Sequence, residues 1–230
     1  KKEEIKLKIK EFLLSDQNIE RDSYIWNMAG SMLMAFQSVI MLMILTRTLG
    51  LKDAGIFTIA YANANLFLTV GKYGMRYFQI SDMKEQFSFA DYRMSRVITS
   101  LAMIITAVVY TLYAAASNGY SSEKVQVIIW MCLFKVVDSV EDVYQGYYQY
   151  KNRLDVGAKC MTLRMIIKIV VYALGLIVLR NQLVSLLVAT ILTTVLFIVF
   201  TKWTIGSFWI AREKAETKKV LELLQICFPL

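Results

Sequence analysis

The sequence contains no histidine and only three cysteines among its 230 residues. Cys132, Cys160 and Cys227 lack metal-ligand spacing, so we interpret them as small apolar side chains. No large loop separates the apolar runs on the side that we assign below to the exterior. Ser31, Ser38 and the cysteines have no base nearby in the sequence. We therefore expect no catalytic residue, no metal and no cofactor, and we do not expect an enzyme.

Proline is nearly absent as well, with Pro229 alone, whereas hydrophobic residues make up 57% of the chain and the mean hydropathy is +0.49. This composition is typical of an integral membrane protein. Runs with the apolar length of a membrane span, about 20 residues, cover residues 24–46, 54–70, 97–116, 125–148, 160–179 and 183–202. We predict an all-α polytopic fold, because helices satisfy their own backbone hydrogen bonds in lipid.

The distribution of lysine and arginine predicts the orientation of the lobe formed by residues 24–203. Basic residues are frequent before the first span, between the second and third, and between the fourth and fifth. Such connections stay in the cytoplasm, so both ends of the lobe are expected there. The net charge of +8 is then explained by topology and by anionic lipid headgroups, and we expect no nucleic-acid partner.

The two ends of the chain have their own patterns. Residues 1–23 carry apolar side chains at helical spacing among lysines, which predicts an amphipathic segment on the membrane surface. We expect no signal peptide, because the first apolar run is too long and follows mixed charges. Residues 204–219 are expected to be a cytoplasmic connector, and residues 220–230 the start of a truncated seventh span.

The fourth predicted span has charged and polar side chains along one face: Lys135, Asp138, Glu141, Asp142, Gln145 and Gln149. Milder polar faces lie on other spans: Asn27 on the first, Asn65, Lys72 and Arg76 on the second, and Arg164 and Lys168 on the fifth. Ionisable residues at bilayer depth are costly and usually mark a solute pathway or a charge pair.

A purely structural interpretation of these charges stays open. Counting about 1.5 Å per residue from the cytoplasmic ends places Asp142 at the depth of Arg164, and Asp138 at the depth of Lys168. The three acids and three bases in the apolar spans also sum to zero. A water-filled cavity is the alternative, because the polar face continues to the cytoplasmic mouth through Gln145 and Gln149.

Two connecting segments resemble a known family. Residues 47–57, RTLGLKDAGIF, are similar to the R-x-L-G-x-x-(D/E)-x-G junction of the polysaccharide-export branch of the multidrug/oligosaccharidyl-lipid/polysaccharide (MOP) exporter superfamily. Residues 71–82, GKYGMRYFQISD, with Asp91, Tyr92, Arg93 and Arg96, resemble the cytoplasmic loop of O-antigen-unit and capsular-repeat flippases. The resemblance extends over essentially the whole chain in span number, polarity and loop length. Gly50 and Gly55 are expected to bracket a tight turn, and Gly71 and Gly74 to end or kink the second helix.

The resemblance implies the N-terminal half of a flippase in the bacterial plasma membrane, a six-helix lobe facing a missing second lobe across a cavity of alternating access. The implied substrate is a polyprenyl-diphosphate-linked oligosaccharide, moved to the outer leaflet for cell-surface polysaccharide export. Cations suit a diphosphate, and the expected headgroup ligands are Arg164, Lys168, Lys72, Arg76 and Lys135. Gln145, Gln149, Asn65 and Asn27 are expected to hydrate or contact sugar.

The carboxylates allow a different interpretation. Asp138, Glu141 and Asp142 cluster at membrane depth, where acidic groups carry protons or bind sodium and so couple transport to a gradient of H⁺ or Na⁺. A multidrug antiporter of the MATE type in the same superfamily needs such a group. A membrane scaffold without transport activity is the third alternative.

Overall fold

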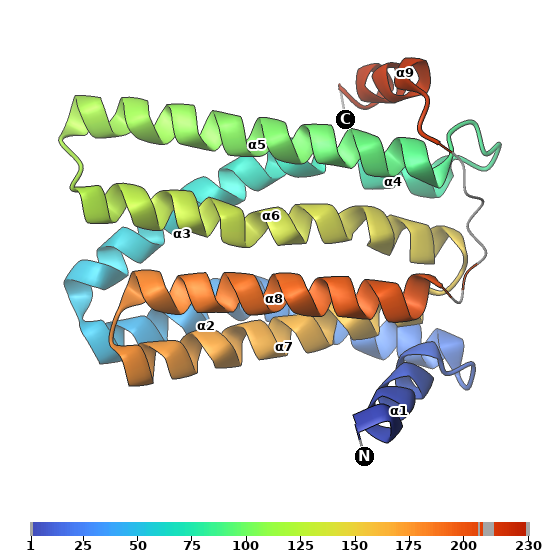
Figure 1. Cartoon of the computed structure of the whole chain (residues 1–230), viewed down its shortest axis with the longest axis horizontal. Helices are drawn as coiled ribbons and strands as arrows, with labels where there is room; N and C mark the ends of the chain where they lie inside the picture. Colours follow the sequence, from blue (N-terminus) through green and yellow to red (C-terminus); the bar gives the residue numbers. More distant parts are fainter. Residues whose placement is uncertain (1, 207, 209–213, 229–230) are drawn as a thin grey trace.

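The computed structural model describes residues 2–206, 208 and 214–228, and within these residues the chain forms nine α-helices and no strand. The all-α prediction is confirmed. Six long helices run side by side and reverse direction at each connection (Figure 1): α2 (Ile19–Leu49), α3 (Leu51–Lys72), α5 (Phe89–Asn118), α6 (Ser122–Tyr150), α7 (Leu154–Leu179) and α8 (Gln182–Ile205). The short helices α1 (Lys2–Leu14), α4 (Met75–Ser81) and α9 (Thr217–Cys227) gather toward one end of the bundle, which we call the α9 end.

Within the described part of the chain, five segments are long and apolar enough to cross a membrane: Ile19–Leu49, Leu51–Ser81, Phe89–Asn118, Leu154–Leu179 and Gln182–Ile205. The chain is therefore a polytopic membrane protein. The remaining long helix, α6, contains the predicted span 125–148 but carries too many charged residues to qualify. It packs against α3, α4, α5, α7 and α8, so its charges face other helices rather than lipid.

Two glycines with positive φ, Gly50 and Gly74, lie at one reversal of the chain and at one break between helices. Gly50, with φ 96°, is the only residue between α2 and α3, as the tight-turn prediction required. Gly55 does not bracket that turn: it lies inside α3, because the helix has already begun at Leu51. The chain breaks again after Lys72, where Tyr73 and Gly74 both adopt left-handed backbone conformations before α4 begins.

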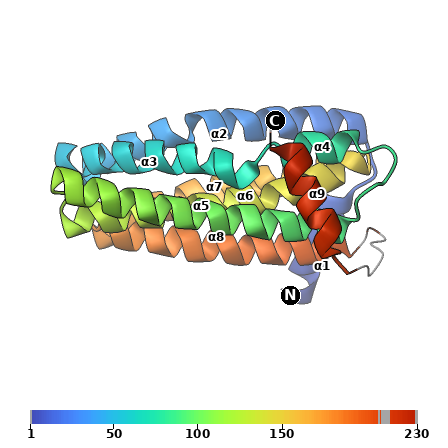
Figure 2. The same cartoon turned by 90° about the horizontal axis from the view of Figure 1, so that it is seen from above.

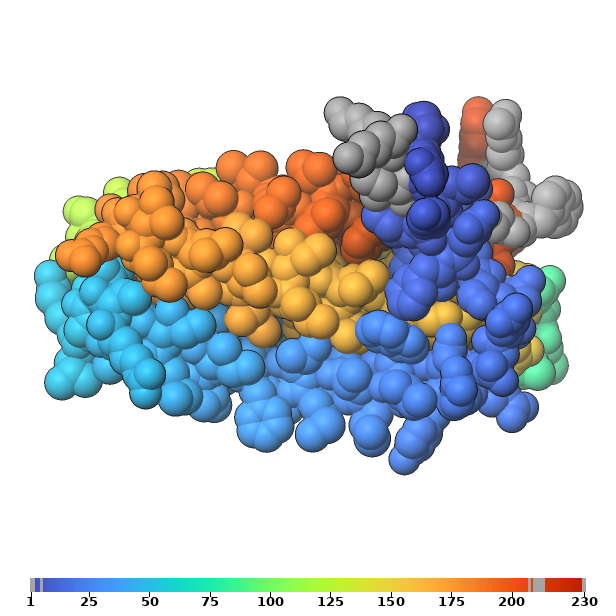
Figure 3. Space-filling view, turned by 90° about the horizontal axis from the view of Figure 1, so that it is seen from below, coloured from blue at the N-terminus to red at the C-terminus, as the bar shows by residue number. Residues whose placement is uncertain are grey.

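Close approach of helices replaces the hydrophobic driving force that is missing between helices in lipid. Gly30 of α2 lies against α7, and a Cβ there would come within 2.5 Å of Met161 Cε and 2.7 Å of Thr162 Oγ1. The Thr162 hydroxyl donates to the Trp26 carbonyl at 3.0 Å, which joins the same two helices. Figure 3 shows α2 and α7 side by side, with α1 projecting at one end of this face.

At the α9 end, Asp91 fixes two helix starts at once. Ser88 and Asp91 form a capping box at the start of α5, and Asp91 Oδ1 also accepts the Glu216 backbone N–H at 2.9 Å, just before α9. α9 then runs across the bundle rather than along it (Figure 2). In sequence, α9 includes residues 220–227 of the predicted seventh span. Residues 229 and 230 of that span, and residues 207 and 209–213 of the predicted connector, lie outside the described residues.

Candidate functional site

The charged face of α6 points into the bundle. Lys135, Asp138, Glu141 and Asp142 are all buried, with residue exposures between 2% and 7%. Because they follow helical spacing, they form a row along one side of α6. Part of this row contacts α7, and the part nearer the α9 end contacts α3 and α5. Two separate clusters result.

The first cluster, which we call the central network, joins α6 to α7. Asp138 Oδ1 accepts from Arg164 Nη2 at 2.8 Å and from Lys168 Nζ at 3.1 Å. Glu141 binds the same guanidinium, with Nε at 3.2 Å from Oε1 and Nη2 in contact with Oε2. Lys135 Nζ lies 3.6 Å from Asp138 Oδ2. The predicted pairing of Asp138 with Lys168 is therefore present, and a guanidinium bound by two carboxylates holds α7 in register with α6.

Neutral groups from α2 and α3 complete the central network. Lys135 Nζ donates to the Tyr61 hydroxyl at 3.0 Å and to Gln37 Oε1 at 3.5 Å. Lys168 Nζ lies 3.8 Å from the centre of the Phe134 ring, a cation–π contact. Four helices thus meet at this network, and its side chains are closed off from solvent.

The second cluster, which we call the Asp142 cluster, lies nearer the α9 end. Arg96 of α5 places Nη2 at 2.9 Å from Asp142 Oδ2, while Arg76 and Lys72 lie at 3.8 and 3.9 Å from Oδ1. The prediction that Asp142 pairs with Arg164 is wrong, because Glu141 and Asp138 occupy that guanidinium. Arg76 also donates to Gln149 Oε1 at 2.8 Å, which brings two of the predicted site residues together.

The break between α3 and α4 belongs to the Asp142 cluster. The carbonyl of Gly71, left without a helical partner by the left-handed residues that follow, accepts from Arg96 Nη1 at 2.6 Å and from Thr99 Oγ1 at 2.8 Å. Arg96 therefore joins the end of α3 to Asp142 on α6. This geometry places Lys72 before the break and Arg76 after it, on either side of one carboxylate.

The two clusters differ in exposure and in charge. The side chains of Arg96, Arg164 and Lys168 are at most 1% exposed, whereas those of Lys72 and Arg76 are 36% and 28% exposed. Around Asp142 three cations share one carboxylate, so two positive charges are left over and the exposed pair carries them. In the central network three cations meet two carboxylates. Both clusters are therefore net positive. The six charges counted from the sequence still sum to zero, and the surplus comes from Lys72, Arg76 and Arg96, which gather around Asp142.

Three of the predicted polar contacts lie elsewhere. Gln145 is buried and donates to the Gly157 carbonyl at 2.7 Å, which fixes the α6–α7 packing. Asn65 is exposed on α3, and Asn27 is half-buried on α2. Neither asparagine takes part in the hydrogen bonds that hold the two clusters among the described residues.

Arg96 is the site residue that sequence reasoning missed. The family resemblance places it in a cytoplasmic loop, but α5 begins at Phe89 and carries Arg96 into the interior. A sequence signal was available: Ser95, Thr99 and Ser100 share its side of the helix, a polar stripe that continues to the buried contact of Ser100 with Ser139.

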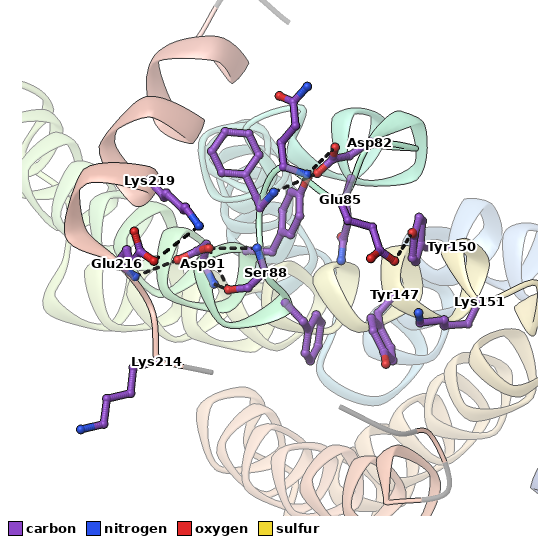
Figure 4. Close-up of a pocket in the computed structure, with 15 residues that line it drawn as sticks. Asp82, Glu85, Ser88, Asp91, Tyr147, Tyr150, Lys151, Lys214, Glu216 and Lys219 are labelled. Atoms are coloured by element: carbon purple, nitrogen blue, oxygen red, sulfur yellow. Dashed lines mark hydrogen bonds and ion pairs between the residues drawn. The ribbon is translucent and has the colours of Figure 1, made fainter. Parts of the chain in front are cut away.

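A cavity of about 620 Å³ lies at the α9 end, apart from both clusters (Figure 4). The α4–α5 connection, the end of α6 and the start of α9 line it. Among the described residues, no group of three or more acidic, cysteine or histidine side chains is placed to hold a metal ion.

Comparison with known proteins gives one match. The sequence model of a family described as "Polysaccharide biosynthesis protein" matches residues 21–230. No curated protein and no solved structure matches the chain.

Proposed function

The chain belongs to the polysaccharide biosynthesis protein family, and from this premise we propose that it is one lobe of a flippase. The family and the membrane-spanning helices together indicate a polysaccharide-export membrane protein, a transporter rather than an enzyme. The proposed substrate is a polyprenyl-diphosphate-linked oligosaccharide, carried from the cytoplasmic to the outer leaflet by alternating access. We place the α9 end in the cytoplasm of a bacterial cell, as the positive connections favour.

The single observation that carries this proposal is the surplus of positive charge in the Asp142 cluster. A diphosphate needs cationic donors, and the half-exposed Lys72 and Arg76 have only one carboxylate to share with the buried Arg96. They are the headgroup ligands that the geometry favours. Gln149, which accepts from Arg76, is the residue that we assign to the adjoining sugar.

Lys135, Arg164 and Lys168 belong to a deeper part of the same proposed path. Each is buried and already bound to Asp138 or Glu141. Phosphate oxygens must replace these carboxylates before the three cations bind substrate, which requires α6 and α7 to rearrange. That requirement fits a second conformation of an alternating-access cycle.

A second lobe is part of the proposal, because polar side chains face outward on this one. Ser31 of α2 and Asn65 of α3 are exposed in the middle of membrane-length helices. An amide turned toward lipid without a partner is costly, whereas one that lines a cavity between two lobes is hydrated. Asn27 lies one turn from Ser31 and is assigned to the same cavity wall.

The antiporter alternative gains no support from the geometry. Asp138, Glu141 and Asp142 each have at least one cationic side chain within 3.2 Å. A coupling H⁺ or Na⁺ would have to compete with these side chains for the same oxygens. Gradient coupling therefore stays outside the function that we propose for this structure.

The test uses cells that lack the full-length gene and measures lipid-linked oligosaccharide on the cytoplasmic leaflet. We expect accumulation, reversed by the wild-type gene and not by the double variant Lys72→Gln/Arg76→Gln, although that variant reaches the membrane. Lys52→Gln is the matched control, since Lys52 is an exposed lysine at the opposite end of α3. Normal export with the double variant would refute the headgroup assignment, and no accumulation without the gene would refute the flippase.

A further inference from the structure

The two carboxylate oxygens of Asp142 face different kinds of cation. Oδ2 lies 2.9 Å from Arg96 Nη2, a charge-assisted hydrogen bond between side chains that are 8% and 1% exposed. Oδ1 faces Arg76 Nη1 at 3.8 Å and Lys72 Nζ at 3.9 Å. These two separations are longer than a hydrogen bond, so the contacts are electrostatic only. One oxygen is therefore held inside the bundle, and the other lies beside the partly exposed cations.

Arg96 is itself fixed by the end of α3. Its Nη1 donates to the Gly71 carbonyl at 2.6 Å, and the Thr99 hydroxyl donates to the same carbonyl at 2.8 Å. With both terminal nitrogens of its guanidinium in use, Arg96 holds Asp142 from the buried side. The carboxylate is thereby kept from turning fully toward the exposed cations.

Lys72 and Arg76 are accessible from the other side of the carboxylate. Their side chains are 36% and 28% exposed, and they lie before and after the break between α3 and α4. An anion that arrives from this side can contact both cations while Asp142 stays on Arg96. A phosphate oxygen bonded to Lys72 at about 2.8 Å would then lie about 6 Å from Oδ1, because Nζ is 3.9 Å from that oxygen. The anion is attracted by two cations and repelled by one carboxylate.

We propose that Asp142 is a built-in competitor of the anionic headgroup, and that Arg96 is the positioning residue that restrains it. The inference rests on the proposed flippase function and adds to it what sets the strength of headgroup binding. In the empty lobe, Oδ1 partly neutralises Lys72 and Arg76. In the loaded lobe, the same charge repels the diphosphate, so the substrate is held loosely enough to leave, as a transport pathway requires.

The experiment measures binding of a synthetic diphosphate diester, with a farnesyl group on one phosphate and a methyl group on the other. This probe has the ionised diphosphate of the proposed substrate but no sugar. In calorimetry with the full-length protein in detergent, Asp142→Asn should bind it at least about tenfold more tightly than the wild type. That factor corresponds to removing one charge about 6 Å away at an effective dielectric constant of about 40. Asparagine keeps the size of the side chain and an oxygen that accepts from Arg96.

Arg96→Met should have the opposite effect and weaken binding, because the released carboxylate then pairs directly with Lys72 and Arg76. The double variant Arg96→Met/Asp142→Asn should bind more tightly than Arg96→Met alone. The opposite signs separate this role from a structural one, since loss of packing would weaken binding in both single variants. A gain in affinity also does not arise from a loss of folded protein.

Two controls show whether the effect acts through the headgroup cations. Glu123→Gln removes an exposed carboxylate at the start of the same helix, about 28 Å along α6 from Asp142, and should leave binding unchanged. In a Lys72→Gln/Arg76→Gln background, Asp142→Asn should not restore binding of the probe, because the cations that it unmasks are missing.

The outcomes distinguish this inference from the function on which it rests. Unchanged or weaker binding by Asp142→Asn would overturn the competitor role, and stronger binding by Arg96→Met would overturn the positioning role. Either result leaves the flippase in place, since the accumulation of lipid-linked oligosaccharide in cells without the gene is measured independently. No binding by the wild type below about 10 mM would refute the headgroup site and the competitor together.

Discussion

Arg96→Met tests the arrangement around the α3–α4 break most directly. The guanidinium of Arg96 joins three helices: it extends from α5, donates to the Gly71 carbonyl at the end of α3 and pairs with Asp142 on α6. Methionine keeps much of the aliphatic length and volume but cannot donate. The substitution therefore removes the interactions and leaves the packing largely intact.

The size of the effect follows from the contacts that remain. Removing one partner of a buried ion pair costs about 3–5 kcal/mol, because the other charge stays buried. Lys72 and Arg76, at 3.9 and 3.8 Å, still lie near Asp142, and Thr99 still donates to the Gly71 carbonyl. We therefore expect a loss at the lower end of that range, about 3 kcal/mol in the free energy of unfolding.

The assay is equilibrium unfolding in mixed micelles, followed by far-ultraviolet circular dichroism. Arg93→Met is the matched control, because Arg93 lies on the exposed side of the same helix and should change stability little. The double variant Arg96→Met/Asp142→Leu should recover most of the loss, since it removes both buried charges. A loss below about 1 kcal/mol for Arg96→Met, or a double variant no more stable than the single one, would refute the reasoning.

Two further predictions concern residues outside the membrane interior. Arg153 pairs with Asp155, which is fully buried, and with Asp16, which is 80% exposed. In the same unfolding assay, Asp155→Asn should lower the free energy of unfolding by about 3 kcal/mol, and Asp16→Asn by less than about 1 kcal/mol. Equal losses for the two variants would contradict the role of burial. Burial raises the pKa of the Cys227 thiol to about 11, so little thiolate forms near neutral pH while α9 is docked. In a variant with alanine at the other two cysteines, maleimide should label the folded protein slowly at pH 7.5 and rapidly after denaturation, and rapid labelling of the folded state would contradict the docked position of α9.

The helical membrane fold was predictable because it depends on local composition. Continuous apolar runs of about 20 residues, with one proline at the far end of the chain, favour helices, which satisfy their own backbone hydrogen bonds in lipid. The same kind of local signal predicted the turn at Gly50 and the break near Gly71 and Gly74. The prediction that Gly55 bounds the same turn was wrong, because a glycine can also be accommodated inside a helix.

The charge partners were only half predictable. Depth counting paired Asp138 with Lys168 correctly, because both lie on antiparallel neighbours joined by a short connection. It failed for Asp142, whose partner comes from α5, a helix whose register against α6 no local count supplies. Asn65 and Asn27 were predicted as polar contacts of the site from the helical spacing of polar residues. That spacing does not show which neighbouring helix packs against a given face.

Hydropathy and helical spacing are properties of neighbouring residues, so they were enough to predict a bundle of membrane helices with ionisable groups at bilayer depth. Which charges neutralise one another, and which are left over, depends on how the helices pack. Burying Arg96 beside Asp142 leaves Lys72 and Arg76 as the exposed positive surplus. That outcome depends on the relative rotation and axial position of α3, α5 and α6, which long-range packing sets and a linear pattern does not contain.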